Sequence, residues 1–169
     1  GEVAVLSDEQ FTTRLDAADE KLSSCNVILY GNADSNSAWY RVLCDPDEAG
    51  GIDVRAGKVR ITDRIFEGDD LLLLAVGPRH DTAPGAALVG IFGSTGVRGS
   101  RLGYQVPVFV SGVGLPDWTL VDSSILDQGD TGVLGAGWKD KKWGMQAPEL
   151  LESVAETPLD GSTEDSTKD

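Results

Sequence analysis

The stretch that looks most like a ligand site is a glycine-rich turn, GIFGSTGVRG, at Gly90–Gly99. It follows an apolar run, so its backbone N–H groups and the hydroxyls of Ser94 and Thr95 would gather at the end of a buried strand. A glycine-rich turn at the start of a helix can hold a phosphate. Its spacing matches neither the dinucleotide-binding nor the nucleotide phosphate-loop pattern, and Arg98 is the only nearby cation. We therefore expect these glycines to serve a tight turn with positive φ.

A second polar group, GNADSN at 31–36, also follows an apolar run. Its side-chain oxygens could hold calcium or a polar ligand. The calcium-loop template fails because its sixth position is Ser37 and its twelfth is Leu43. An N-cap at Asp34 or Ser35 for the next helix explains the same residues. From the two groups together, the candidate ligand-binding residues are Asn32, Asp34, Asn36, Ser94 and Thr95.

Hydrolytic residues are harder to find. Gly129–Gly132, GDTG, is similar to the GDSG turn of chymotrypsin-like proteases, and His80 is the single histidine. Thr131 takes the nucleophile's place, and about 50 residues between His80 and Thr131 leave little room for the intervening barrel. Ser94 and Ser111 both have Phe where a nucleophile elbow needs Gly. We expect no catalytic residue, and one His with two separated Cys predicts no metal site and no cofactor.

Charge and hydropathy exclude whole classes of partner. The chain has 28 acidic and 14 basic residues and a net charge of −14. Nucleic acid needs clustered Lys and Arg, so we expect no nucleic-acid partner and no attraction to anionic membranes. No apolar run reaches the roughly 18–20 residues of a membrane span, so no membrane insertion is expected. No basic-then-apolar leader opens the sequence, so any signal peptide is removed or lies upstream.

The two cysteines bear on the compartment. Cys25 precedes the apolar run at 26–31, and Cys44 closes the expected helix Asn36–Leu43. In a strand–helix unit the helix returns towards the start of the strand, so a Cys25–Cys44 disulfide fits the geometry and would stabilise the fold by about 3 kcal/mol. Two buried free thiols are the alternative. A disulfide would indicate an oxidising compartment.

These residues must be positioned by short elements. Ser7 begins a helix, with Gln10 completing a capping box. Strands are expected at 26–31, 71–76, 86–92, 118–121 and 132–138, and a β-hairpin insertion at Ile52–Phe66. Leu71–Val76 is apolar throughout, which is typical of a central parallel strand covered on both faces. The predicted fold is α/β: a small, mainly parallel sheet sandwiched by helices.

Aromatic residues allow two interpretations. The aromatic side chains could form a stacking platform for sugars, or they could pack in the core or at a domain interface, which we favour. They are Trp39, Trp118, Trp138, Trp143, Tyr30, Tyr40 and Tyr104. The predicted organisation is an N-terminal helical segment (1–24) packed on the domain, an α/β domain (25–144) and an acidic C-terminal tail (145–169).

Five phrases suggest a family. NVILYGNADSNSAW (26–39), FEGDDLLLL (66–74), VGIFGSTG (89–96), PVFVSGVGLPDWTLVD (107–122) and GVLGAGWKDKKW (132–143) together resemble the C-terminal accessory α/β domain of large secreted bacterial proteins of the prolyl-oligopeptidase and α/β-hydrolase type. In that family the catalytic triad belongs to the preceding domain. The resemblance implies secretion or a place in the cell envelope, and it transfers no catalytic residue.

The function expected from the sequence is therefore a non-catalytic accessory or interaction module of a secreted or cell-surface hydrolase, or a self-associating extracellular protein. Its protein partner would be the hydrolase domain or identical copies. The alternative is a small-molecule or carbohydrate-binding domain that uses the carboxyl ends of its strands.

Overall fold

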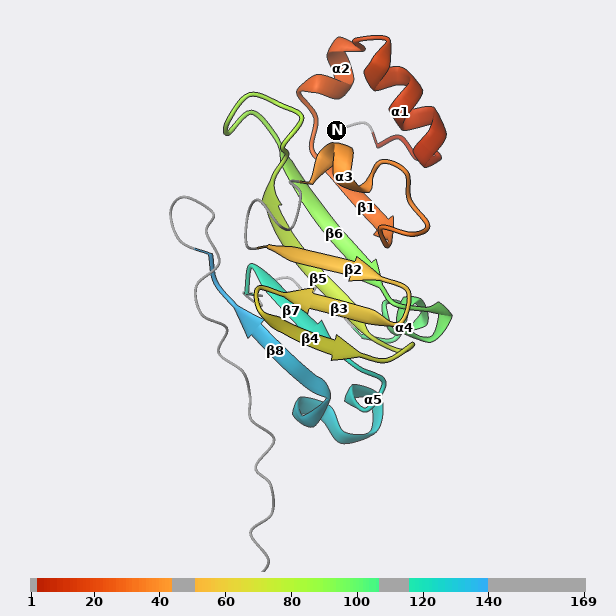
Figure 1. Ribbon diagram of the computed structural model, residues 1–169, viewed down its shortest axis with the longest axis vertical. Helices are drawn as coiled ribbons and strands as arrows, with labels where there is room; N and C mark the ends of the chain where they lie inside the picture. Colours follow the sequence, from red (N-terminus) through yellow and green to blue (C-terminus); the bar gives the residue numbers. More distant parts are fainter. Residues whose placement is uncertain (1–2, 44–50, 107–115, 140–169) are drawn as a thin grey trace, which may run out of the picture.

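The computed structural model describes residues 3–43, 51–106 and 116–139 of the chain. Its centre is a five-stranded sheet with the order β1-β6-β5-β7-β8 (Figure 1). The strands are β1 (Val27–Gly31), β5 (Leu72–Pro78), β6 (Leu88–Ser94), β7 (Trp118–Val121) and β8 (Val133–Gly137). Only the β1–β6 pair of this sheet is parallel, and the other three pairs are antiparallel.

A second sheet covers one face of the first. Its strands β2 (Ile52–Arg55), β3 (Lys58–Ile61) and β4 (Arg64–Glu67) form an antiparallel meander. Val54, Val59 and Ile61 are fully buried and share one core with Leu73 and Trp118 of the larger sheet. The expected hairpin insertion is thus a three-stranded sheet that forms one layer of a sandwich.

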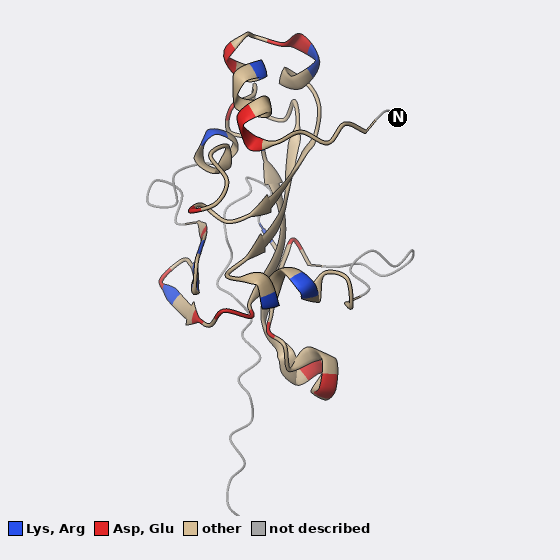
Figure 2. Ribbon diagram, turned by 90° about the vertical axis from the view of Figure 1, so that its right-hand side faces the viewer, with Lys and Arg blue, Asp and Glu red and all other residues tan. Residues whose placement is uncertain are grey.

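Helices are short and lie around the sheets. They are α1 (Asp8–Asp16), α2 (Glu20–Ser23), α3 (Trp39–Val42), α4 (Val97–Leu102), α5 (Ile125–Gln128) and the 3₁₀ turn η1 (Gly129–Gly132). Helix α1 starts at Ser7 with the predicted capping box to Gln10. Figure 2 shows the three-stranded sheet on one side of the larger sheet and α4 and α5 on the other. We call this second side the outer face.

The predicted fold class is wrong: the protein is strand-rich and mostly antiparallel, not a parallel sheet sandwiched by helices. The error comes from β5. Leu71 and Leu73 face the core shared with the three-stranded sheet, while Leu72 packs with Leu102 of α4 in a second cluster on the outer face. A strand covered on both faces is apolar at every position, whichever direction its neighbours run.

Candidate functional site: the carboxyl ends of β1 and β6 and the outer face

The parallel β1–β6 pair brings the two predicted polar groups together. Gly31 pairs with Gly93, so both strands end at the same edge of the sheet. Asn32 is 8% exposed and donates from Nδ2 to the Ser94 carbonyl at 2.8 Å. Its Oδ1 accepts the backbone N–H of Asp34 at 3.1 Å. Asn32 therefore ties the two strand ends to each other and engages both ends of its amide.

The hydroxyls of the glycine-rich turn also bond within the chain. Thr95 is 3% exposed, and its Oγ1 accepts the Leu71 N–H at 3.1 Å. Ser94 is 4% exposed, and its Oγ lies 2.6 Å from Ser100 Oγ in α4. These contacts join β6 to the start of β5 and to α4. They hold the turn closed.

Asp34 belongs to an ion network on the three-stranded sheet. Its carboxylate accepts Arg55 Nη1 at 3.0 Å and the Ala56 N–H at 2.9 Å. Arg55 also donates to the buried Asp53 and to the Tyr40 hydroxyl. Tyr40 in turn donates to Asp53 at 2.8 Å. Desolvation, followed by that hydrogen bond, raises the pKa of Tyr40 to about 12.

The predicted side-chain cap at Asp34 or Ser35 is wrong, because the N-cap of α3 is Ala38 and no side chain caps this helix. Asn36 instead forms a local turn just before the helix. Its Oδ1 accepts the Ala38 N–H at 3.0 Å at the start of α3, and its Nδ2 donates to the Tyr30 carbonyl at 3.0 Å. The second bond occupies a carbonyl at the end of edge strand β1. Thus all five candidate ligand-binding residues are engaged with the chain itself.

The glycines of the turn are required for close packing and not for positive φ, because neither Gly96 nor Gly99 lies in the left-handed region. A Cβ on Gly96 would lie 2.5 Å from the Asp69 carbonyl oxygen, and a Cβ on Gly99 would lie 2.1 Å from that of Leu71. The backbone of residues 69–71 therefore packs directly against the turn. The positive-φ expectation is corrected for both positions.

Carboxylates beside the turn disfavour an anion. Arg98 lies 3.4 Å from Asp69 and 3.9 Å from Asp70. Ser123 donates to Asp70 from its hydroxyl and its backbone N–H. The hydroxyl contact, more than the charge of Arg98, lowers the pKa of Asp70, which stays ionised. The positive charge of Arg98 is thus already neutralised in part.

His80 and the GDTG turn lie at opposite ends of the sheet. His80 follows β5, and its backbone N–H donates to the Val42 carbonyl at 2.8 Å. Strands β5 and β8 run in the same direction because each is antiparallel to β7. Gly129–Gly132 precedes β8, so it lies near the start of β5 and not near its end. The two fragments do not form a triad.

The Sγ of Cys25 lies 3.5 Å from the Leu22 carbonyl oxygen, and no other described residue forms a disulfide with it. Cys44 lies outside the described residues, so the disulfide stays a prediction.

Trp39 and Trp118 are core residues, as expected, whereas Trp138 is 55% exposed. Trp143 and the acidic tail also lie outside the described residues.

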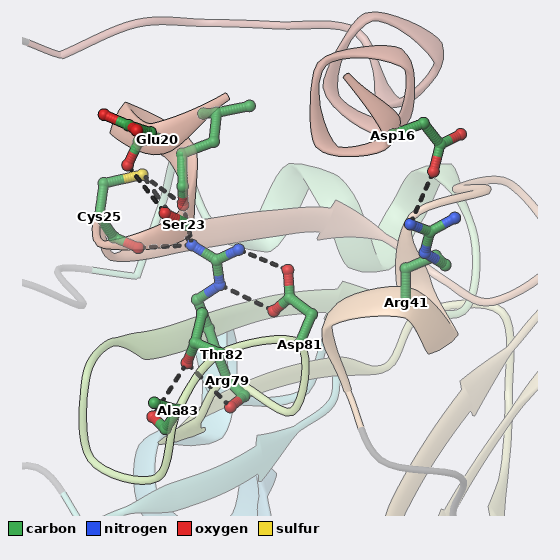
Figure 3. Close-up of polar contacts among 10 residues, drawn as sticks. Asp16, Glu20, Ser23, Cys25, Arg41, Arg79, Asp81, Thr82 and Ala83 are labelled. Carbon is green, nitrogen blue, oxygen red and sulfur yellow. Dashed lines mark hydrogen bonds and ion pairs between the residues drawn. The ribbon is translucent and has the colours of Figure 1, made fainter. Parts of the chain in front are cut away.

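A buried arginine, Arg79, was missed by the sequence analysis. Its guanidinium donates to Asp81 at 2.9 and 2.5 Å, and to the carbonyls of Leu22 at 2.6 Å and Cys25 at 2.7 Å (Figure 3). It also lies 5.9 Å from the Phe11 ring centroid. Arg79 fastens the N-terminal helices to the end of β5. The one signal in the sequence was Asp81, two residues after Arg79, which could have been predicted as an ion-pair partner.

The chain matches no known family model, curated protein or solved structure. Within the described residues there is no cluster of three or more residues able to hold a metal ion. Nor does the described part contain a helix with the length and apolar character to cross a membrane. The functional argument therefore depends on the geometry of the chain itself.

The outer face of β1 carries two large exposed side chains, Ile28 and Tyr30, and the sequence analysis singled out only Tyr30, as a possible stacking residue. Ile28 is 58% exposed and Tyr30 is 61% exposed. Tyr30 packs beside Phe92 of β6, with ring centroids 5.0 Å apart. Gly90 of β6 lies beside Ile28, and a Cβ there would contact the Ile28 side chain at 3.5 Å. We call Ile28, Tyr30, Gly90 and Phe92 the β1 patch.

Proposed function

We propose that this chain is a non-catalytic interaction module that docks through the β1 patch onto a partner protein, the hydrolase domain of the same secreted polypeptide. The observation that carries this proposal is the exposure of Ile28 and Tyr30 side by side on a sheet face. Large apolar side chains grouped on a surface are typical of protein interfaces. Tyr is also among the residues that contribute most to interface energy.

The hydrogen bonds that the polar side chains at the ends of β1 and β6 make within the chain support the same proposal. A binding site for a small molecule needs polar groups that point into open space. The side chains of Asn32, Asp34 and Asn36, and the hydroxyls of Ser94 and Thr95, instead hold loops and strands together. Their polar groups stabilise the scaffold that presents the β1 patch.

The choice of a hydrolase domain as partner depends on the sequence resemblance described above. Its test begins with the parent reading frame, which should encode a hydrolase domain upstream of Gly1. That domain and this chain are then expressed separately and titrated in a calorimeter. We expect saturable binding to the wild-type chain, weakened at least about tenfold by Ile28→Asp or Tyr30→Asp because a carboxylate would be desolvated at the interface.

Ile65→Asp is the matched control, because Ile65 is 60% exposed on β4 of the three-stranded sheet. It introduces the same charge on another surface and should leave the affinity unchanged. A reading frame without a hydrolase domain would remove the partner assignment. Equal affinities for wild type and both β1 patch variants would remove the docking site.

A further inference from the structure

Helix α4 lies above helix α5 on the outer face of the larger sheet in the view of Figure 2. Leu102 of α4 is buried in the cluster formed with Leu72 and Val121, and Ile125 of α5 packs against that same cluster. Because their buried sides share one cluster, their exposed sides form neighbouring parts of one surface.

The two helices carry opposite charges. Helix α4, VRGSRL, has two arginines and no acid, which no other helix in the described part of the chain does. Helix α5 and the η1 turn, ILDQGDTG, have Asp127 and Asp130 and no base. Figure 2 shows the blue segments of α4 above the red segments of α5. The surface is thus divided into a basic half and an acidic half.

Part of this charge forms no ion pair within the described part of the chain. Arg101, Asp127 and Asp130 are exposed, and none of them forms an ion pair with any residue in 3–43, 51–106 or 116–139. Apolar side chains accompany both halves: Val97 is 68% exposed, Leu126 46% and Tyr104 93%. Tyrosine and arginine over an apolar base are typical of the energetic centres of interfaces.

A twofold axis would satisfy these charges. Rotation of one copy by half a turn about an axis between the helices places α4 of each copy against α5 of the other, as in isologous dimers. We infer that the α4–α5 surface is the contact between two copies of this chain. The inference extends the proposed interaction function to self-association and uses a surface other than the β1 patch.

The net charge of −14 acts against this association but does not prevent it. Repulsion between distant surface charges is screened beyond about 8 Å at physiological ionic strength. Opposite charges in direct contact are screened less. We therefore expect a weak, reversible dimer in which the Arg101 and aspartate contacts determine the orientation.

Sedimentation equilibrium of the whole chain over a range of concentrations tests the inference. The wild type should reach a monomer–dimer equilibrium. Arg101→Glu alone should raise the dimer dissociation constant at least about tenfold, since it places like charges together. Combining Arg101→Glu with Asp127→Arg, or with Asp130→Arg, should restore the constant to within about threefold of wild type, because one ion pair is rebuilt in reverse.

Arg64→Glu on β4 is the matched control, with the same change of charge on an exposed residue of the three-stranded sheet, and should leave the dimer intact. A wild type that stays monomeric at every concentration would overturn the inference. So would a dimer that Arg101→Glu leaves unchanged, or one that neither double variant restores. Ile28→Asp should not alter dimerisation, so a failed dimer and a failed β1 patch give different results.

Discussion

Arg79 has a structural role that the sequence analysis did not predict. Its side chain is fully buried, yet each part of the guanidinium has an acceptor, from Asp81 or from the carbonyls of Leu22 and Cys25. Removing one partner of a buried ion pair costs more than the pair contributes, because the other charge is left unpaired.

Arg79→Met should therefore lower the free energy of unfolding by about 3–5 kcal/mol. Amide hydrogen exchange should accelerate first in α1 and α2, which Arg79 fastens to the sheet. Arg41→Met is the matched control, since Arg41 pairs with Asp16 on the surface at 2.8 Å (Figure 3). That change should cost less than about 1 kcal/mol by denaturant titration. Similar losses for both variants would contradict the assigned role of Arg79.

Tyr40 gives a pH dependence with a definite sign. Its pKa is raised to about 12, chiefly by desolvation and then by its hydrogen bond to Asp53. Between about pH 10 and pH 12 the unfolded chain loses this proton while the folded chain retains it. Stability should fall over that window as the pH rises, and ultraviolet absorbance should show a late phenolate transition. In Tyr40→Phe both the late transition and this part of the alkaline loss should disappear.

The residue scale also shows why the polar positions could be predicted but not their role. Asn32, Ser94 and Thr95 were expected at one edge, and the parallel β1–β6 pair places them there. The Leu71 N–H that bonds to Thr95 comes from 24 residues earlier in the chain, whereas Ser100, which bonds to Ser94, lies six residues on in α4. A pattern along one strand carries no information about which distant segment will fill its turn.

At the scale of elements, the strand positions were largely predicted and their directions were not. The expected strand at 118–121 is β7, and the runs at 71–76 and 86–92 overlap β5 and β6. Helix α3 has four residues, fewer than the expected Asn36–Leu43, and is too short to serve as a crossover along the sheet. The described part of the chain has no long helix between its strands that could connect parallel neighbours, and most neighbouring strands are antiparallel.

Close packing between elements gives a direct test at Gly99. On helix propensity alone, Gly99→Ala should stabilise α4 by up to about 1 kcal/mol. Because the new Cβ would lie 2.1 Å from the Leu71 carbonyl oxygen, backbone must move, and we expect a loss of about 3 kcal/mol instead. Gly90→Ala is the control, since its Cβ would meet Ile28 at an ordinary 3.5 Å and stability should change by less than about 1 kcal/mol. Thermal unfolding of both variants measures the difference.

At the scale of the whole molecule, the arrangement of the layers determines which side chains are exposed. The three-stranded sheet covers one face of the larger sheet, and α4 and α5 cover only part of the outer face (Figure 2). Strand β1 is the edge strand of the larger sheet, and its Ile28 and Tyr30 side chains are exposed. The sequence predicted an interaction module in general terms. It did not predict which surface such a module would use, because the exposure of β1 depends on which segments pack against the sheet.

The most direct test of the proposed function is amide chemical-shift mapping of this chain during titration with the hydrolase domain that we propose as its partner. The interaction account predicts the largest shifts at Ile28, Tyr30 and Phe92, with small shifts at the strand ends. Shifts concentrated instead at Asn32 and Ser94, with the β1 patch unchanged, would contradict it.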